Sequence, residues 1–359
     1  MKTILPYQQI GIIGGGQLGR MMCLAAKAMG YRVAVLEPTP NCPCGQVADV
    51  EINAPYNDLE AIKKLAEISD VITYEFENID YAALAWLEEN AYLPQGSHVL
   101  KVNQHRFLEK KTISEMGVRV ADFRLIESPS DLVNISYPSV LKTTMGGYDG
   151  KGQVVLRSEA DLDRARELAK NECILEKFVP FTKEISVLVA RSTTGEISVF
   201  PVAENVHVNN ILHTSTVPAR ISQKVEQEAV ECAVTIAESL GSVGILAIEM
   251  FVVDNSIVVN EIAPRPHNSG HYTIDACVTS QFEQHVRAVC GLPLGATTLH
   301  TPVVMVNILG EHIKDMSSLE RYLPLLSNGK IHLYGKAKAV DGRKMGHINL
   351  LGGHSPFGT

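Results

Sequence analysis

The sequence has no long apolar run, no excess of basic residues and no regular pattern of cysteines. None of its apolar runs approaches the roughly 18–20 residues that a membrane-spanning helix requires. Lysine and arginine number 32 against 40 aspartate and glutamate residues, which gives a net charge of −8. Because a protein that binds nucleic acid broadly needs a basic surface, we predict neither a nucleic-acid partner nor a membrane partner.

Signals for secretion and for structural metal are also missing. Residues 1–14 hold one lysine and no sustained apolar segment, so we expect them to lead into a strand rather than to form a signal peptide. The seven cysteines are scattered, which is typical of free thiols in a reducing cytoplasm. Cys42 and Cys44 form a single close pair, and no second pair completes a zinc site. No internal repeat and no P-loop motif G-x-x-x-x-G-K-[ST] occurs.

The length of 359 residues predicts two or three domains, and 45% apolar residues suffice for full cores. The first hundred residues alternate between strand-like and helix-like segments. Strands are expected at 9–13, 32–37 and 70–75, and the helix after the first strand should end at Gly30. This alternation predicts a parallel sheet with helices on both faces, in a domain that ends near Gly96.

Residues 97–117 are expected to be helical and cationic, and from about 118 strand-like runs dominate. A long amphipathic helix is predicted over 222–240, because apolar residues keep helical spacing and Gly241 follows as a stop. This block predicts an antiparallel α+β domain reaching to about 295. The remaining residues predict a small domain of short strands.

The segment GGGQLG at 14–19 lies between the first strand and the first helix. Gly14, Gly16 and Gly19 fit the dinucleotide-binding pattern G-x-G-x-x-G, and Glu37 follows at the expected distance. Taken alone, this pattern favours an NAD(P)-dependent dehydrogenase.

Two glutamates are predicted to face each other across a hairpin. Strands are expected at 246–253 and 257–262, and a hairpin folded about residue 255 places Glu249 opposite Glu261. Like charges directly opposite destabilise a sheet, whereas a hard cation such as Mg²⁺ between them is stabilising. The alternative is a register slip that leaves one glutamate facing solvent.

The residues that follow this hairpin support the metal hypothesis. The run PRPHNSGH at 264–271 places Arg265, His267, Asn268 and His271 beside the expected cation. Asn260 and Asn268 are available as further oxygen ligands. A plain surface turn has no need of so many polar donors between prolines.

A glycine-rich segment, KTTMGGYDGKGQ at 142–153, lies between two expected strands. Its backbone N–H groups can wrap phosphates, and Lys142 and Lys151 add positive charge. The alternative is a flexible hairpin. Further along, an edge run at 176–179 is expected to recognise an adenine ring and Glu184 to hold ribose hydroxyls, although such Glu–Lys strands are usually solvated.

Three basic residues close to the C-terminus form a local positive cluster in a protein that is acidic overall. Lys336, Arg343 and Lys344 lie within nine residues and are expected to bind a substrate phosphate. The alternative is a solvated basic face.

Taken in order, these segments resemble the ATP-grasp family over nearly the whole chain. The matching segments are GGGQLG, LKTTMGGYDGKGQ, EKFV, Glu184, Glu249, NEIAPRPHNSGH and YGKAKAVDGRKMGH. Within that family, GYDGKGQ with RPHNSGH resembles the purine-biosynthesis ligases that carboxylate 5-aminoimidazole ribonucleotide to N5-carboxyaminoimidazole ribonucleotide. The nearest alternative is the formate-dependent glycinamide ribonucleotide transformylase, which typically has aspartate where Asn268 stands.

The resemblance implies an ATP-grasp fold of mixed α/β and α+β class. Its parts would be an N-terminal Rossmann-like domain at 1–96, an ATP-grasp domain at 97–295 and a small C-terminal β-rich domain at 296–359. A lid subdomain is expected at about 118–180. The resemblance further implies a cytoplasmic homodimer whose partners are small molecules.

The implied site residues fall into four groups. ATP contacts are expected at Arg106, Lys142, Gly147, Tyr148, Asp149, Gly150, Lys151, Gly152, Gln153, Glu176, Lys177, Phe178, Val179, Glu184, His207, Asn260 and Glu261. Mg²⁺ is expected on Glu249 and Glu261. Ribonucleotide contacts are expected at Gln17, Leu18, Glu75, Arg265, His267, Asn268, Lys336, Arg343 and Lys344. The residues expected to take part in catalysis are Tyr148, Asp149, Lys151, Arg265 and Lys336.

The implied reaction joins ATP, bicarbonate and 5-aminoimidazole ribonucleotide, and it releases ADP and phosphate through carboxyphosphate. Because water destroys carboxyphosphate quickly, the glycine-rich segment is expected to close over the site. A dehydrogenase would leave this segment and the glutamate pair without a role. A non-catalytic nucleotide-binding protein would tolerate Glu261→Gln. On the ATP-grasp hypothesis GGGQLG contacts the ribonucleotide, and Glu37 is only the end of a strand.

Overall fold

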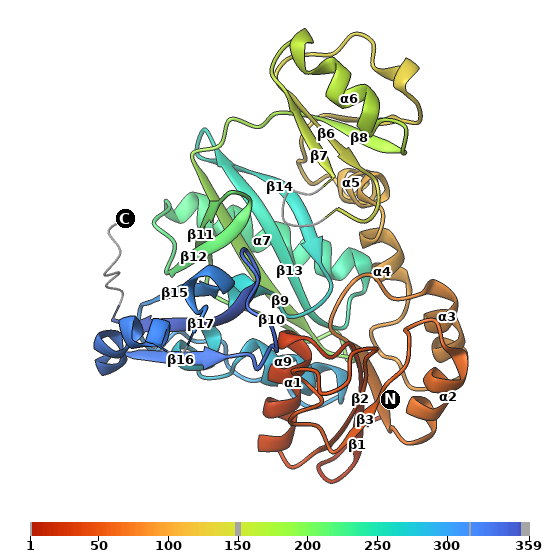
Figure 1. Ribbon diagram of the computed structural model, residues 1–359, viewed down its shortest axis with the longest axis vertical. Helices are drawn as coiled ribbons and strands as arrows, with labels where there is room; N and C mark the ends of the chain where they lie inside the picture. The colour runs from red at the N-terminus through yellow and green to blue at the C-terminus, as the bar shows by residue number, and fades with distance from the viewer. Residues whose placement is uncertain (1, 148–151, 316, 353–359) are drawn as a thin grey trace.

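The structure, a computed structural model, describes residues 2–147, 152–315 and 317–352. Figure 1 shows an N-terminal α/β part, a large central sheet and a smaller sheet at the opposite end of the molecule from the N-terminal part. Two helices, α4 (His98–Asn103) and α5 (Arg106–Glu115), connect the N-terminal part to the smaller sheet. No helix in the described ranges is long and apolar enough to cross a membrane.

The N-terminal part is a four-stranded parallel sheet, as the alternating pattern predicted. Its strand order is β3-β2-β1-β4, with β1 (Gln9–Ile13), β2 (Arg32–Leu36), β3 (Val50–Ile52) and β4 (Val71–Tyr74). Its helices are α1 (Gln17–Ala28), α2 (Leu59–Glu67) and α3 (Tyr81–Asn90). The third strand was not predicted, because three residues with a central glutamate are too short to show a strand period.

The large sheet has nine antiparallel strands in the order β14-β13-β9-β11-β12-β15-β17-β16, and β10 pairs with β9. Its strands are β9 (Lys183–Arg191), β10 (Ile197–Val199), β11 (Ala203–Val208), β12 (Ile211–Val217), β13 (Gly244–Val253), β14 (Ser256–Ala263), β15 (Val303–Leu309), β16 (Gly329–Leu333) and β17 (Lys344–Leu351). The expected small C-terminal domain therefore does not form a sheet of its own, because β15 pairs with β12. Every residue of β15 is buried, and covering both of its faces requires the neighbouring elements.

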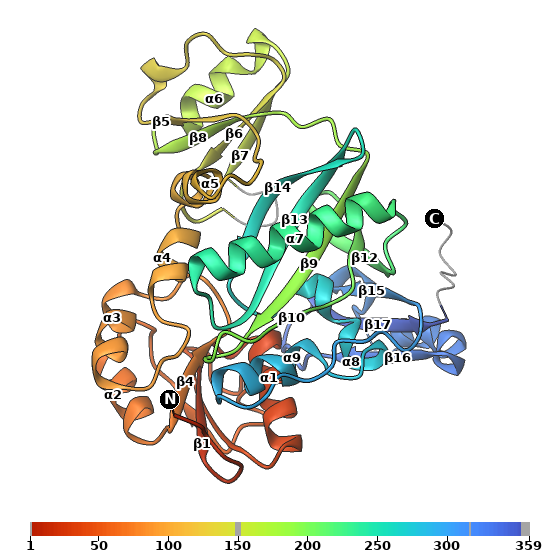
Figure 2. The same cartoon turned by 180° about the vertical axis from the view of Figure 1, so that it is seen from behind.

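Two helices fix the large sheet from different sides. The predicted long helix is α7 (Gln223–Leu240), which lies across β9 and β13 in Figure 2. The Ser222 hydroxyl caps its start and Gly241 ends it with φ of 60°, a left-handed conformation that favours glycine. The second helix, α9 (Gln281–Val289), was not predicted, and its apolar side shares one core with α1.

The remaining helices are mostly a single turn or two, and η5 is a longer 3-10 helix. They are α6 (Leu162–Leu168), α8 (Thr273–Ala276) and the 3-10 helices η1 (Pro129–Asp131), η2 (Glu159–Asp161), η3 (Asn268–Gly270), η4 (Gly310–His312) and η5 (Ser317–Ser327).

The smaller sheet contradicts one prediction. Its order is β5-β8-β6-β7, with β5 (Phe123–Ile126), β6 (Ser139–Thr143), β7 (Gln153–Leu156) and β8 (Cys173–Lys177). The run at 176–179 was expected to be an edge, but β8 lies between β5 and β6. Glu176 pairs with Phe123 on one side and Val140 on the other, so only residues 178 and 179 leave the sheet.

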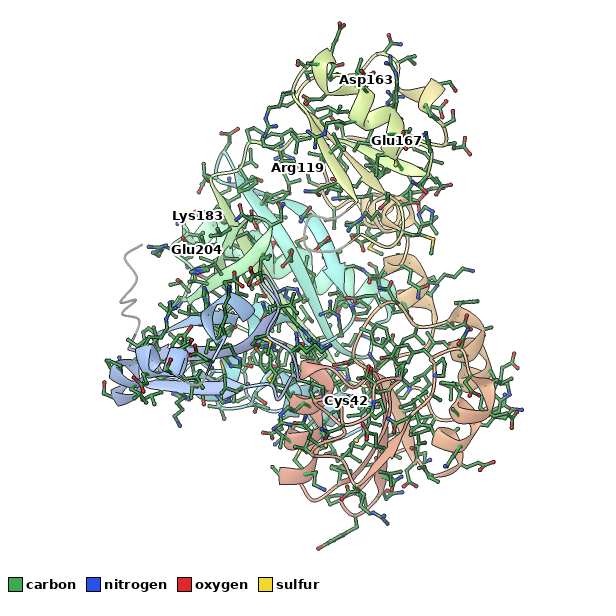
Figure 3. All side chains as sticks on the ribbon, in the orientation of Figure 1. Cys42, Arg119, Asp163, Glu167, Lys183 and Glu204 are labelled. Carbon is green, nitrogen blue, oxygen red and sulfur yellow. The ribbon has the colours of Figure 1, made fainter. Side chains whose placement is uncertain are left out.

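The ion pairs of Glu204 on β11 are expected to stabilise the fold in a pH-dependent way. Its carboxylate lies 2.8 Å from the Lys183 ammonium group, its neighbour in Figure 3, and 2.7 Å from the Arg220 guanidinium group. Burial raises the pKa of Glu204, but these two cations outweigh it and lower the pKa to about 2. We expect Glu204→Gln to cost about 1–2 kcal/mol of unfolding free energy at pH 7.

Urea unfolding of both proteins at pH 7 and pH 3 checks this expectation. Because the folded-state pKa lies below the unfolded value near 4.5, the stabilisation is present above pH 4.5 and is lost as the pH falls toward 2. The gap between wild type and Glu204→Gln should therefore narrow at pH 3. A gap that stays constant with pH would contradict the ion-pair explanation.

Candidate active site

Two cavities meet at a shared wall of four residues. The larger, of about 560 Å³, lies between the smaller sheet and the large sheet, and the second, of about 240 Å³, lies against the N-terminal part. Arg265, His267, Asn268 and Lys344 line both cavities. Ligands bound in the two cavities would therefore share these four side chains as neighbours.

Most of the predicted residues that the structure describes line one or both cavities. The predicted ATP and metal residues that line the larger cavity are Arg106, Lys142, Gly147, Gln153, Phe178, Glu184, His207, Glu249, Asn260 and Glu261. The second cavity is lined by the predicted ribonucleotide residues Gln17, Leu18 and Glu75 in addition to the shared four. Segments separated by about 250 residues in the sequence thus form one wall.

Several predicted residues do not line either cavity, and their roles stay predictions. Among the described residues, the cavity linings do not include Gly152, Glu176, Lys177, Val179, Lys336 or Arg343. The Lys336 ammonium group donates to the Lys344 carbonyl oxygen at 2.7 Å, and the Arg343 guanidinium group donates to the Lys338 carbonyl oxygen at 3.1 Å. Tyr148, Asp149, Gly150 and Lys151, which were predicted to contact ATP, lie outside the described residues.

Glu249 and Glu261 are paired across β13 and β14, as predicted, but the hairpin reaches that register by a different route. The turn contains only Asp254 and Asn255, both with positive φ, so uninterrupted pairing would place Glu249 opposite Asn260. A one-residue β-bulge beside Glu249 shifts the register and brings Glu261 opposite it. The bulge therefore creates the acidic pair.

The two carboxylates have opposite electrostatic surroundings. Burial and the charge of Glu261 raise the pKa of Glu249 to about 8. Burial also raises the pKa of Glu261, but the charges of Arg106 and Lys142 outweigh it and hold this pKa below its usual value. The Arg106 guanidinium group lies 3.2 Å from the Glu261 carboxylate. Ionising Glu249 beside the charged Glu261 is thus unfavourable, and a bound cation would relieve this repulsion.

Lys110 contacts residues at the site, and sequence reasoning did not single it out. Its buried ammonium group donates to the Asn260 carbonyl oxygen at 2.5 Å and lies 3.8 Å from the Glu176 carboxylate. Lys142 lies 2.8 Å from the other oxygen of Glu176. Burial raises the pKa of Glu176, but these two lysines outweigh it and lower the pKa to about 2. Glu176 therefore holds Lys142 at the cavity wall and does not face the cavity itself.

A second missed residue is Glu77, which lines the larger cavity. Its carboxylate lies 2.5 Å from the Arg265 guanidinium group. It follows β4 by three positions, at the carboxyl end of a parallel strand, where ligand-binding residues of α/β sheets usually lie. That rule could have identified Glu77 from the sequence.

Glu184 and His207 form a polar pair at the wall of the larger cavity. Glu184 Oε2 lies 2.5 Å from His207 Nδ1. Burial lowers the pKa of His207, but the contact with Glu184 and the charge of Glu249 outweigh it and raise the pKa above its usual value.

The GGGQLG segment uses its N–H groups inside the protein. The buried Glu75 carboxylate accepts hydrogen bonds from the Gly16 and Gly19 N–H groups, and the Glu37 carboxylate accepts one from Gly15 at 2.9 Å. These carboxylates occupy the helix N-terminus at which a dinucleotide would place its pyrophosphate. The segment therefore does not support the dehydrogenase hypothesis, and Glu37 has a structural role.

The buried amide group of Asn268 is available to bind a ligand. Only 6% of the residue is exposed, and neither polar atom of its amide group has a hydrogen-bond partner within the described part of the chain. Because an unpaired buried amide is costly, a ligand in either cavity is the natural partner.

Comparison with known proteins places these features in a family. Residues 7–104 match the ribonucleotide synthetase preATP-grasp domain, residues 111–282 match the ATP-grasp domain, and residues 303–355 match the phosphoribosylaminoimidazole carboxylase C-terminal domain. The N5-carboxyaminoimidazole ribonucleotide synthase of Bacillus subtilis (strain 168) is 56% identical over 356 residues, which cover 98% of this chain and 93% of that one.

Two solved structures are similar along nearly the whole chain. An ADP complex of an N5-carboxyaminoimidazole ribonucleotide synthetase has a TM-score of 0.95 and 62% identity, covering 99% of this chain and 95% of the other. The N5-carboxyaminoimidazole synthase of Aspergillus clavatus, in complex with ADP and 5-aminoimidazole ribonucleotide, has a TM-score of 0.90 and 32% identity. That match covers 98% of this chain and 95% of the other.

Proposed function

This chain belongs to the N5-carboxyaminoimidazole ribonucleotide synthase family of ATP-grasp ligases, and on that premise we propose that it uses ATP and bicarbonate to carboxylate 5-aminoimidazole ribonucleotide. The observation that carries this proposal is the wall shared by the two cavities. A nucleotide in the larger cavity and a ribonucleotide in the smaller one would both reach Arg265, His267, Asn268 and Lys344.

The chemistry needs a phosphoryl transfer followed by a carboxyl transfer between neighbouring sites. Bicarbonate attacks the γ-phosphorus of ATP, which forms carboxyphosphate and ADP. Carboxyphosphate then breaks down to CO₂ and phosphate, the amine of the ribonucleotide attacks the CO₂ carbon, and the amine releases a proton. Arg265 and Lys344 lie where both steps develop negative charge, and preorganised cations stabilise such charge.

The residues of the two cavities have different proposed roles in this reaction. In this proposal Lys142, held by Glu176, and Arg106 neutralise the phosphates, and Glu184 holds ribose hydroxyls; all line the larger cavity except Glu176. Gln17, Leu18 and Glu75, which line the second cavity, contact the ribonucleotide. We further propose that the segment containing Tyr148, Asp149 and Lys151 completes the reacting centre.

Glu249 and Glu261 fit a magnesium site. Mg²⁺ commonly takes one or two carboxylates and completes its shell with water and substrate phosphates. Within the described part of the chain no three His, Cys, Asp or Glu side chains cluster as an all-protein metal centre. A pair of carboxylates in direct cross-strand register suits Mg²⁺, which supplies positive charge to the phosphoryl oxygens when bound.

Glu249→Gln is expected to stabilise the metal-free fold in alkaline solution. Because the folded-state pKa of Glu249 is about 8 and the unfolded value about 4.5, the metal-free protein loses stability as the pH rises between these values. Removing the charge should recover about 0.5–1 kcal/mol at pH 9 and almost nothing at pH 4.5. Thermal melts at both pH values, in EDTA, measure this difference.

The same variant should lose its response to magnesium. Wild type is expected to melt at a higher temperature when Mg²⁺ and ADP are added together, whereas Glu249→Gln should respond much less. Glu204→Gln, on the same sheet but away from the cavities, provides the control that keeps the full response. A Glu249→Gln protein that is less stable than wild type at pH 9 in EDTA would contradict the proposed repulsion.

An assay of ADP release with each substrate omitted in turn tests the proposed reaction. We expect ADP release only when ATP, bicarbonate and 5-aminoimidazole ribonucleotide are all present. Release that requires formate and glycinamide ribonucleotide instead would support the transformylase alternative. ADP release without any ribonucleotide would leave the second cavity without its proposed ligand.

We also propose that the protein works as a cytoplasmic homodimer. Light scattering after size-exclusion chromatography should then give twice the chain mass of 39.2 kDa.

A further inference from the structure

Behind His267 runs a line of four buried polar side chains. His267 Nδ1 lies 2.9 Å from the hydroxyl oxygen of Ser269, and the Ser186 hydroxyl donates to that oxygen at 2.8 Å. The Asn205 side-chain NH₂ donates to Ser186 at 2.9 Å, and its oxygen accepts from the Ser215 hydroxyl at 2.7 Å. Ser186, Ser215 and Ser269 are fully buried, and Asn205 is 5% exposed.

The direction of this line follows from one contact. The backbone N–H of Ser269 donates to His267 Nδ1 at 3.3 Å, and an amide N–H can only donate. Nδ1 therefore carries a lone pair, and the Ser269 hydroxyl also donates to it. Since a hydroxyl has one proton, Ser269 must accept from Ser186, and Ser186 in turn accepts from the Asn205 NH₂ group. Every link then points toward His267.

To form this line, the protein has to bury polar groups, which is unfavourable. Three hydroxyl groups and an amide occupy interior positions on β9, β11, β12 and η3, where apolar side chains would pack without a polar penalty. Such a network is tolerable only when every member is satisfied, and each link here is within 2.9 Å. A directed network that ends on a cavity residue indicates a positioning role.

We infer that the Ser215–Asn205–Ser186–Ser269 line, together with the Ser269 backbone N–H, fixes His267 as the Nε2–H tautomer, which makes it a hydrogen-bond donor to an anionic oxygen where the two cavities meet. Nε2 lies 3.6 Å from Glu249 Oε1, and the ring lines both cavities. On the proposed function, from which the identity of this oxygen follows, the oxygen belongs to bicarbonate or carboxyphosphate. His267 then does not take the proton of the reacting amine, because the nitrogen that faces the cavity already carries one.

The tautomer can be measured in the ligand-free protein by NMR of the ¹⁵N-labelled histidine rings, with His267→Gln identifying the His267 signals by their loss. We expect Nε2 to show the protonated-nitrogen signal and Nδ1 the lone-pair signal. A proton on Nδ1 would overturn the inference. The measurement does not depend on turnover, so a failure of the ADP assay would overturn the proposed function and leave this result standing.

Ser186→Ala tests whether the line sets the tautomer. Without the Ser186 hydroxyl, the Ser269 hydroxyl is free to accept from Nδ1–H, and only the longer 3.3 Å contact from the Ser269 backbone N–H still favours the lone pair on Nδ1. We therefore expect a detectable population of the second tautomer and a kcat about 10-fold lower. Ser186→Thr keeps a hydroxyl and should restore the single tautomer and most of kcat. Ser139→Ala removes another buried strand hydroxyl, which donates to Ser136, and should change neither quantity.

Two results from this series would overturn the inference. The first is a Ser186→Ala protein with only the Nε2–H tautomer and wild-type kcat. The second is a loss of kcat in Ser186→Ala while the tautomer stays unchanged, because the line would then support only the fold.

Discussion

Glu261→Gln is expected to lower kcat by about 10³-fold or more. The substitution keeps the shape of the side chain but removes one of the two carboxylates that face each other across β13 and β14. It also weakens the contact with Arg106, whose guanidinium group lies 3.2 Å from the carboxylate. Loss of a metal-binding charge in a phosphoryl-transfer site costs several kcal/mol of transition-state stabilisation, and about 1.4 kcal/mol corresponds to a factor of ten.

Steady-state ADP release at saturating Mg²⁺ and substrates measures the effect of Glu261→Gln. The matched control is Glu204→Gln, which removes a buried carboxylate from the same sheet outside both cavities and should keep kcat. Turnover close to wild type in Glu261→Gln would support the non-catalytic alternative and contradict the proposed magnesium site.

Arg265→Met is expected to lower kcat by about 10²- to 10³-fold. Arg265 lies on the wall shared by both cavities, and Glu77 orients its guanidinium group at 2.5 Å. Its Nε atom is buried and has no hydrogen-bond partner within the described residues, so part of its donor capacity is available to a ligand. Because Arg265 also borders the second cavity, KM for the ribonucleotide should rise more than KM for ATP.

Arg265→Lys should fail to restore turnover. A lysine supplies the charge but not the planar group that can bind Glu77 and an oxyanion at the same time. The control is Arg220→Met, which breaks an arginine–carboxylate pair outside the cavities and should leave kcat unchanged. Full activity of Arg265→Lys would show that charge alone is required at this position.

Much of the local structure followed from the sequence. The parallel sheet, the helix at α7 and the cross-strand pairing of Glu249 with Glu261 agree with the predictions. These features depend on periodicity, caps and turn residues, which act over a few positions. The prediction paired the correct two glutamates, but its argument was incomplete. It assumed a symmetric hairpin about residue 255 and did not include the β-bulge that sets the register.

The errors involve contacts that no local pattern encodes. The run at 176–179 has the composition of a strand, but its place between two other strands depends on how β5 and β6 pair with it. Of the basic triad, Lys344 lines the cavities, and the phosphate-binding roles of Lys336 and Arg343 stay predictions.

By itself, the sequence determined which elements form and which residue types carry charge, since backbone geometry and side-chain chemistry are local. No local pattern brings Gln17, Glu75, Arg265 and Lys344 together. The family resemblance implied a common site for them, and in the structure the packing of the N-terminal part against the large sheet puts all four around one cavity. The tertiary structure alone decided that Glu75 occupies the N-terminus of α1, which removes the dinucleotide site that GGGQLG would otherwise provide. A segment that fits a motif locally keeps its predicted ligand only when no other part of the chain binds there first.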